Sequence, residues 1–580
     1  MKNTIRRILT TVLRCSQMQL LILGVSILCI YGHTMNVPFY MDDYPSIVDN
    51  LNIHQLSLKN IWNYSPFRFV TYVSFALNYS FHQKSVFGYH IINILIHFFV
   101  GWGIYYLVKV FIGIPKINLN TSNEMRPWLP ILSALIFVVH PLNTQAITYI
   151  VQRLASLAAL FYILSMAFYI NARISKASTP KKYILFTCAL LFAIMALFTK
   201  ENTVTLIIII PCIEIVFFQK MNTSRLCIFG SKLIAIFSFW ILHAWIRNIN
   251  PFSFSHIETF TRLGTDVPRT TYLFTQLKVL WIYIRLFFIP TGLRLDYDIP
   301  PATFDWTVFL ALICHLLVFW CAFIIRKQKP VVLFSILFYY ITHLIESSII
   351  PIKDFCFEHR AYLPNVGLSI LCAYFSINII EKCNKYSLRY ALIGVLIVIL
   401  MVFGILTWER NNLWNNPIAF WRNCSVYSPQ KVRVWTELGK NLIVAEKNNE
   451  AIEALNNALK YSVNSTGQLK INVQLICNLI VLLHKKGDSE KAIQLANQAL
   501  QYPINNLYRF YILNNLGNIY IENKFFALAE NYYRKAIGSY SNNEMAFRGL
   551  YYSLILQDKS VEAGQILSNH PDLLKKLRKK

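Results

Sequence analysis

Long apolar segments alternate with short polar ones over most of the chain, and the pattern changes near residue 410. From residue 17 to residue 409, apolar runs recur that are long enough to cross a bilayer as helices, which takes roughly 17–25 residues each. Beyond them the sequence turns polar. The pattern predicts an all-α protein: a polytopic helical membrane domain at 1–410, a linker at 411–431, and soluble helical repeats at 432–580.

Small residues recur within the polar region and predict those repeats. Ala451, Ala492, Ala529 and Ala563 are separated by 41, 37 and 34 residues, and a Leu-x-x-Leu-Gly-x-x-Tyr motif begins at Leu513. This resembles the tetratricopeptide pattern, in which small residues let two antiparallel helices approach closely. Stacked helix pairs of this kind leave a concave face that binds an extended peptide or another protein. A structural cap on the membrane domain is the alternative.

Composition agrees with a membrane protein. The chain is 55% hydrophobic and 14% charged, against about 25% charged residues in soluble domains. Its net charge of +27 suggests nucleic-acid binding at first sight. The lysines and arginines, however, cluster in short loops between apolar runs, as cytoplasmic loops of membrane proteins do. Nucleic-acid binding is therefore not expected. The twelve cysteines form no Cys-x-x-Cys pair, so a structural zinc site is not expected either.

Loop charges also predict the topology. Arg6, Arg7 and Arg14 place the N-terminus in the cytoplasm. Every basic loop stays inside if the run Tyr272–Pro290 lies in the membrane interface instead of crossing. This gives about 11 spans and an extracytoplasmic C-terminus. The loops 32–86 and 248–305 are then on the outer side.

Asp42 and Asp43 follow the first apolar run and are the foremost candidates for chemistry. No basic residue lies within ten positions to neutralise them. Charged groups at membrane depth are costly, and they mark functional sites by default. A cation, a substrate hydroxyl or a buried partner is therefore expected beside this pair.

Further charged residues stand at the ends of apolar runs on the same predicted side. They are Arg68, Arg153, Lys200, Glu201, Glu358, His359 and Arg360. Arginine binds phosphate by bidentate contact and lysine as a point charge, so these cations suit a lipid-linked, phosphate-bearing donor. A carboxylate beside them can act as general base or hold a divalent cation. Simpler interpretations remain: Lys200 and Glu201 pair with each other, Arg153 snorkels to the interface, and His359 orients a neighbour.

The order of these motifs resembles the multi-pass glycosyltransferases of the C superfamily (GT-C). It is most similar to the transmembrane-and-tetratricopeptide O-mannosyltransferases and their bacterial relatives. The matching stretches are Asp42-Asp43, 67–78, 88–93 with His97, 140–145, Gln152-Arg153, 200–202 and 358–364.

The resemblance implies a GT-C-like fold and transfer of a sugar, mannose in the related enzymes, from a polyprenyl-phosphate donor with inversion. The acceptor is a hydroxyl outside the cytoplasm, on a polypeptide or a glycan brought by the repeats. By motif position, Asp42 and Asp43 are the catalytic pair, one as general base and the other as its partner. No cofactor is certain, and a divalent cation stays open.

Three other functions use similar residues. A polymerase or ligase of lipid-linked glycan shares the substrate class. A flippase would carry the same headgroup but normally shows pseudo-repeats in its membrane half, and a scaffold needs no charged outer face. A bacterial inner membrane with periplasmic repeats is the expected location, or the membrane of the endoplasmic reticulum in a eukaryote.

Overall fold

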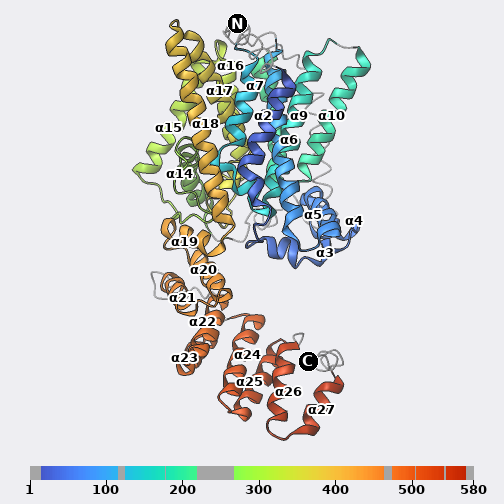
Figure 1. Cartoon of the computed structure of the whole chain (residues 1–580), viewed down its shortest axis with the longest axis vertical. Coiled ribbons are helices and arrows are strands. Elements are labelled where there is room, and N and C mark those ends of the chain that lie inside the picture. The colour runs from blue at the N-terminus through green and yellow to red at the C-terminus, as the bar shows by residue number, and fades with distance from the viewer. Residues whose placement is uncertain are drawn as a thin grey trace, which may run out of the picture. The chain divides into compact units, whose positions relative to one another are not determined.

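The computed structural model describes residues 15–114, 125–176, 178–218, 265, 267–462, 473–502, 504–540 and 544–569. These residues are helical, without a β-strand, which confirms the all-α class. The chain divides into two compact units, Met1–Asn416 and Pro417–Lys580. Figure 1 shows the long helices of the first unit side by side as a bundle.

The first unit contains nine long helices and several short ones in its described part. The long helices are α2 (Ser16–Tyr31), α6 (Val86–Ile112), α9 (Arg153–Ile174), α10 (Thr179–Leu197), α14 (Arg269–Phe288), α15 (Trp306–Ile324), α16 (Pro330–His343), α17 (Asn365–Lys382) and α18 (Tyr386–Trp414). Shorter ones are α7 (Trp128–Val138), α11 (Leu206–Ile213) and the π-helical turn η7 (Glu214–Phe218).

Within the described residues, seven helical segments are long and apolar enough to cross a membrane. An eighth is counted if the bent pair Trp128–Val138 and Pro141–Thr148 is one span. A multi-pass membrane domain is therefore confirmed. The number of about 11 spans stays a prediction. Arg6, Arg7, Arg14 and the first part of the predicted loop 248–305 lie outside the described residues.

Helix α14, the segment predicted to lie in the interface, is bonded along its length to loops. Tyr272 Oη donates to Glu346 O (2.7 Å), Gln276 Nε2 to Phe355 O (2.9 Å), and Tyr283 Oη to Phe357 O (3.0 Å). All three acceptors belong to one stretch that also leads to Glu358. Other bonds join α14 to α15 and α16, among them Trp281 Nε1 to Ala311 O (3.2 Å) and Tyr339 Oη to Leu280 O (2.8 Å), and its interfacial placement stays a prediction.

The connection between α7 and α9 is not one continuous helix. Instead the chain forms a 3-10 turn, η4 (Pro141–Asn143), a single helical turn, α8 (Gln145–Thr148), and a second 3-10 turn, η5 (Ile150–Gln152). Arg153 then begins α9. Pro141 explains the break, because proline removes a backbone donor and cannot continue the preceding helix.

The loop 32–86 is a small folded layer. It forms α3 (Leu51–His54), α4 (Leu58–Tyr64) and α5 (Phe69–His82), which gather at one end of the bundle in Figure 1. Its own apolar core includes Ile53, Ile61 and Phe75, all buried, together with Ile150 from η5. The core therefore joins this layer to the segment that precedes α9.

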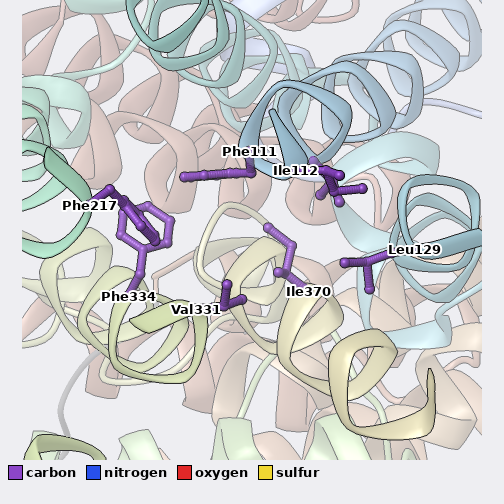
Figure 2. A pocket seen from close by; sticks show the side chains of 8 residues that line it. Phe111, Ile112, Leu129, Phe217, Val331, Phe334 and Ile370 are labelled. Atoms are coloured by element: carbon purple, nitrogen blue, oxygen red, sulfur yellow. The ribbon is translucent and has the colours of Figure 1, made fainter. Parts of the chain in front are cut away.

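Another part of the bundle is closed by apolar side chains. Figure 2 shows Phe111, Phe217 and Phe334 turned toward one another around a cavity of about 10 Å³. The ring centroids of Phe111 and Phe334 are 5.1 Å apart. All the residues lining the cavity are apolar, and a buried water needs polar partners, so this space is dry and carries no site.

The second unit is a stack of helix pairs. Its helices are α19 (Pro417–Tyr427), α20 (Val432–Val444), α21 (Asn448–Ser462), α22 (Val473–Lys485), α23 (Ser489–Leu500), α24 (Asn506–Glu522), α25 (Phe526–Ser539), α26 (Glu544–Ile555) and α27 (Ser560–Asn569). The predicted linker 411–431 contains the end of α18 and all of α19. Ala451, Ala492, Ala529 and Ala563, from which the repeats were predicted, are fully buried. Gly517 leaves no space for a larger residue, because a Cβ at this position would lie 2.6 Å from the Tyr533 ring.

Candidate functional site

Asp43 is buried and holds the first outer loop in place. Its Oδ2 accepts the N–H of Tyr40 (2.9 Å), and its Oδ1 accepts the N–H of Val151 (2.7 Å). Burial raises the pKa of Asp43 to about 8, against the lowering effect of these two N–H groups. With both oxygens occupied by the backbone, Asp43 joins the loop to η5 and is closed to a substrate.

Asp42, its neighbour, is exposed. Its backbone N–H donates to Tyr149 Oη at 2.8 Å. The preceding residue, Met41, has φ 30°, in the left-handed region that costs a non-glycine residue about 1–3 kcal/mol. Such strain persists only where surrounding bonds hold it. The bonds of Tyr40, Asp42 and Asp43 therefore fix how the Asp42 carboxylate is presented.

We expect Asp43→Asn to lower the free energy of unfolding by about 1–3 kcal/mol, the usual cost of an unsatisfied buried polar group. Asparagine has one acceptor oxygen, so its NH₂ group would face the N–H of Tyr40 or of Val151. Thermal unfolding of the two proteins measures the difference.

The pH dependence of that difference has a definite sign. Because the pKa of Asp43 is raised in the folded state to about 8, folding binds a proton at a pH where the unfolded chain has lost it. The contribution of Asp43 to wild-type stability therefore falls as pH rises from about 4 to about 8. The deficit of Asp43→Asn should be largest at low pH and shrink toward pH 8 (a deficit that grows with pH would contradict this account).

The segment 141–152 connects the aspartate loop to the rest of the site. Tyr149 and Val151 bond the Asp42-Asp43 backbone and side chain, as described above. One helical turn earlier, Gln145 Oε1 accepts the N–H of His359 at 2.8 Å. Thr148 Oγ1 donates to Asn411 Oδ1 of α18 at 2.7 Å. The segment 141–152 therefore contacts both the aspartate loop and the stretch that begins at Glu358.

Three cations from different loops, Arg68, Lys200 and Arg360, form a group that we call the cation cluster. Arg68 Nε pairs with Glu201 Oε1 (2.9 Å) in a half-exposed contact, and Lys200 Nζ pairs with Glu346 Oε1 (2.7 Å) in a buried one. Lys200 and Glu201 therefore do not pair with each other.

The cluster acts as one electrostatic unit. Burial acts to raise the pKa of Glu346, but the charges of Lys200 and Arg360 outweigh it and the pKa is lowered. The charge of Glu346 also reaches Arg68. Three cations therefore face the two carboxylates of Glu201 and Glu346. This balance leaves positive charge for an anionic ligand.

His359 lies among these cations and is neutral. Burial lowers its pKa well below the usual value, and the charges of Lys200, Arg360 and Arg68 lower it further. Its ring stacks on Phe357 (centroids 5.2 Å apart), and its buried Nδ1 has no hydrogen-bond partner among the residues that the structure describes. A buried polar atom of this kind calls for a partner, and a ligand oxygen beside the cation cluster would supply one.

Glu358 is fully buried and bonded on all sides. Its Oε1 accepts the N–H of Arg294 (2.5 Å) and the hydroxyl of Tyr297 (2.9 Å), and Arg410 of α18 lies 3.4 Å away. Burial raises its pKa, with Arg410 and these donors opposing the rise. Glu358 therefore ties the loop after α14 to α18 from a fully buried position.

Arg153 lies apart from the cation cluster and does not snorkel. It is fully buried; its Nε donates to Asn93 Oδ1 (2.7 Å) and a terminal nitrogen to Tyr89 O (3.1 Å). Its guanidinium also lies over the Phe75 ring, 4.6 Å from the centroid. These contacts join the start of α9 to α5 and α6. Arg153 therefore supports the site from within the fold and does not reach a phosphate.

Sequence reasoning missed three charged or phenolic residues of the site: Glu346, Arg410 and Tyr149. Glu346 and Arg410 are charges at the ends of apolar runs, the same signal that found Lys200. Tyr149 gave no signal, because tyrosine is common in this chain and its partner is a backbone N–H. Among the described residues, no group of three or more His, Cys, Asp or Glu could hold a metal ion.

Comparison with known proteins supports the resemblance predicted from the motifs. A tetratricopeptide-repeat model matches residues 510–543, which confirms the repeat that begins at Leu513. The chain is 23% identical over 446 residues to protein O-mannosyl-transferase F38B6.6 of Caenorhabditis elegans, covering 73% of this chain and 59% of that protein.

Two further relatives have the same name for their activity. Protein O-mannosyl-transferase tmtc2 of Xenopus laevis is 22% identical over 538 residues, with 76% of this chain and 62% of the relative covered. Human protein O-mannosyl-transferase TMTC3 is 23% identical over 501 residues, which cover 77% of this chain and 51% of the human protein. The chain thus spans about half to three fifths of these relatives. Over about three quarters of its own length, it is similar to the transmembrane-and-tetratricopeptide O-mannosyltransferases.

Proposed function

We propose that this chain transfers a sugar, with mannose as the first candidate, from a polyprenyl-phosphate donor to a hydroxyl group of a polypeptide outside the cytoplasm. The observation that carries the proposal is that one segment, 141–152, bonds both the exposed Asp42 and His359, which lies among the cations of the cluster. The names of the relatives supply the sugar and the acceptor class.

Asp42 acts as the general base. It takes the proton of the acceptor hydroxyl while that oxygen forms a bond to the anomeric carbon of the sugar. The bond from this carbon to the phosphate oxygen breaks, and its electron pair leaves on the polyprenyl phosphate. A single displacement of this kind inverts the anomeric centre. Asp43, with its two backbone bonds, holds the loop and takes no proton from the acceptor.

The cation cluster binds the donor phosphate. Arg68, Lys200 and Arg360 stabilise the charge that grows on the leaving phosphate, and preorganised charges of this type act without reorganisation during the reaction. The neutral His359 adds a hydrogen bond. Glu201 and Glu346 hold Arg68 and Lys200 in place, so they position the binding groups instead of contacting the donor.

The repeats suit a polypeptide acceptor better than a lipid-linked glycan. Asn416, the last residue of the first unit, lies two residues after Trp414, whose backbone oxygen accepts the Tyr40 hydroxyl (2.7 Å). The end of the first unit and the aspartate loop therefore lie at the same end of the membrane domain. We infer that the repeats are on the outer side, in the periplasm or in the lumen of the endoplasmic reticulum.

Reconstituted proteoliposomes test the proposal. The full chain receives polyprenyl-phosphate mannose labelled in the sugar, together with a mixture of serine- and threonine-containing polypeptides. We expect label in the polypeptide, released by alkaline β-elimination. Label in a lipid-linked glycan would favour the polymerase or ligase, and translocated but uncleaved donor would favour the flippase.

A further inference from the structure

The loop that presents Asp42 is held by a stack of three aromatic side chains, Tyr40, Tyr149 and Trp414. The Tyr40 and Trp414 rings meet edge to face with centroids 4.9 Å apart, and Tyr149 stacks on Trp414 at 5.9 Å. All three side chains are buried. Such aromatic pairs contribute about 0.5–1.5 kcal/mol each beyond the area they bury. The stack therefore provides a rigid base for the strained residue Met41.

The hydroxyl of Tyr149 connects this stack to Asp42 by a hydrogen bond of 2.8 Å. It accepts the Asp42 N–H, which leaves its own proton free to donate. That proton lies near carboxylates, because the charges of Asp42 and Asp43 both raise the pKa of Tyr149, after burial as the larger cause. One phenol therefore bonds the backbone of Asp42 and lies within reach of the charge on its carboxylate.

We propose that Tyr149 is a positioning residue for Asp42. Its hydroxyl accepts the N–H of Asp42 and donates to the carboxylate, so that the base is held in one orientation toward the acceptor hydroxyl. This inference rests on the proposed function, because Asp42 has a proton to take only if the chain transfers a sugar to a hydroxyl. The expected effect is on the chemical step, since misplacing a reacting group by 1 Å can cost about 10²-fold in rate.

Tyr149→Phe tests the inference because it keeps the ring on Trp414 and removes only the hydroxyl. We expect kcat for sugar transfer to fall by about 10-fold to 10²-fold. The KM values for donor and acceptor should stay within a factor of about two, because the cation cluster and the repeats are untouched.

The matched control is Tyr362→Phe. Tyr362 is also fully buried, and its hydroxyl is bonded to His97 Nδ1 at 2.7 Å, away from Asp42. The Tyr362→Phe variant should lose about as much thermal stability as Tyr149→Phe and keep its kcat within about twofold of the wild-type value. Equal kcat values for the two variants would overturn the positioning role.

A double-mutant cycle adds a second readout. If Tyr149 acts through Asp42, adding Tyr149→Phe to Asp42→Asn should lower the residual rate no further. The same fold-loss in both backgrounds would show that Tyr149 acts on something else. If the wild-type chain transfers no sugar, the proposed function itself fails, whereas a normal wild-type rate with an unaffected Tyr149→Phe variant overturns only this inference.

Discussion

Asp42→Asn is expected to lower kcat for sugar transfer by about 10²–10⁴-fold, the usual contribution of a general base. The side chain is exposed, and no neighbouring backbone group depends on its oxygens in the way that Tyr40 and Val151 depend on Asp43. Thermal stability should therefore stay within about 0.5 kcal/mol of wild type, as for other surface substitutions.

Asp49→Asn is the control for this prediction, because Asp49 is an exposed carboxylate of the same loop. The chemical change is identical, and kcat should remain near the wild-type value. An Asp42→Asn enzyme with full activity, or one whose activity falls only in parallel with its stability, would remove Asp42 as the base.

The second large effect concerns Glu346. Breaking a buried ion pair by removing one partner typically costs about 3–5 kcal/mol, because the remaining charge is uncompensated. Glu346→Gln leaves Lys200 in this state, 2.7 Å from a neutral amide. We expect a large loss of stability without ligand. We also expect binding of polyprenyl phosphate to become about tenfold tighter, because its phosphate replaces the missing charge.

Glu214→Gln provides the comparison. Glu214 pairs with Arg173 through two contacts of 2.6 and 2.8 Å, and this pair is also largely buried. The Glu214→Gln variant should be destabilised as well. Titration with polyprenyl phosphate, however, should raise the Tm of this variant by the same amount as it raises the Tm of the wild type. A tenfold difference in affinity corresponds to about 1.4 kcal/mol. Equal ligand-induced shifts in the two variants would show that the phosphate does not meet Lys200.

The overall architecture was predictable because it follows from spacing alone. Apolar runs of membrane length gave the bundle, and the alanines from Ala451 to Ala563 gave the helix pairs, where each is fully buried. The break after α7 was harder to predict. Its apolar composition resembles a continuous helix, and only Pro141 indicated that the chain would turn into short helical segments before Arg153.

The residues of the site were predicted better than their partners. Charges that interrupt apolar runs are visible in sequence, so Asp42, Lys200 and Arg360 could be found. Which of these side chains are buried, and which groups they bond, could not be predicted from the sequence. Asp42 and Asp43 are adjacent, yet one is exposed and the other accepts two backbone N–H groups. Arg153 looked like a phosphate ligand until its contacts with Asn93 and Tyr89 were seen.

The most direct test of the central claim compares two classes of donor. Purified full-length chain in proteoliposomes is supplied either with polyprenyl-phosphate mannose or with a nucleotide-linked mannose, and transfer to polypeptide is followed with and without Asp42→Asn. The account predicts transfer from the lipid donor alone, lost in Asp42→Asn and retained in Asp49→Asn. Transfer from the nucleotide sugar, or transfer from the lipid donor that does not depend on Asp42, would contradict it.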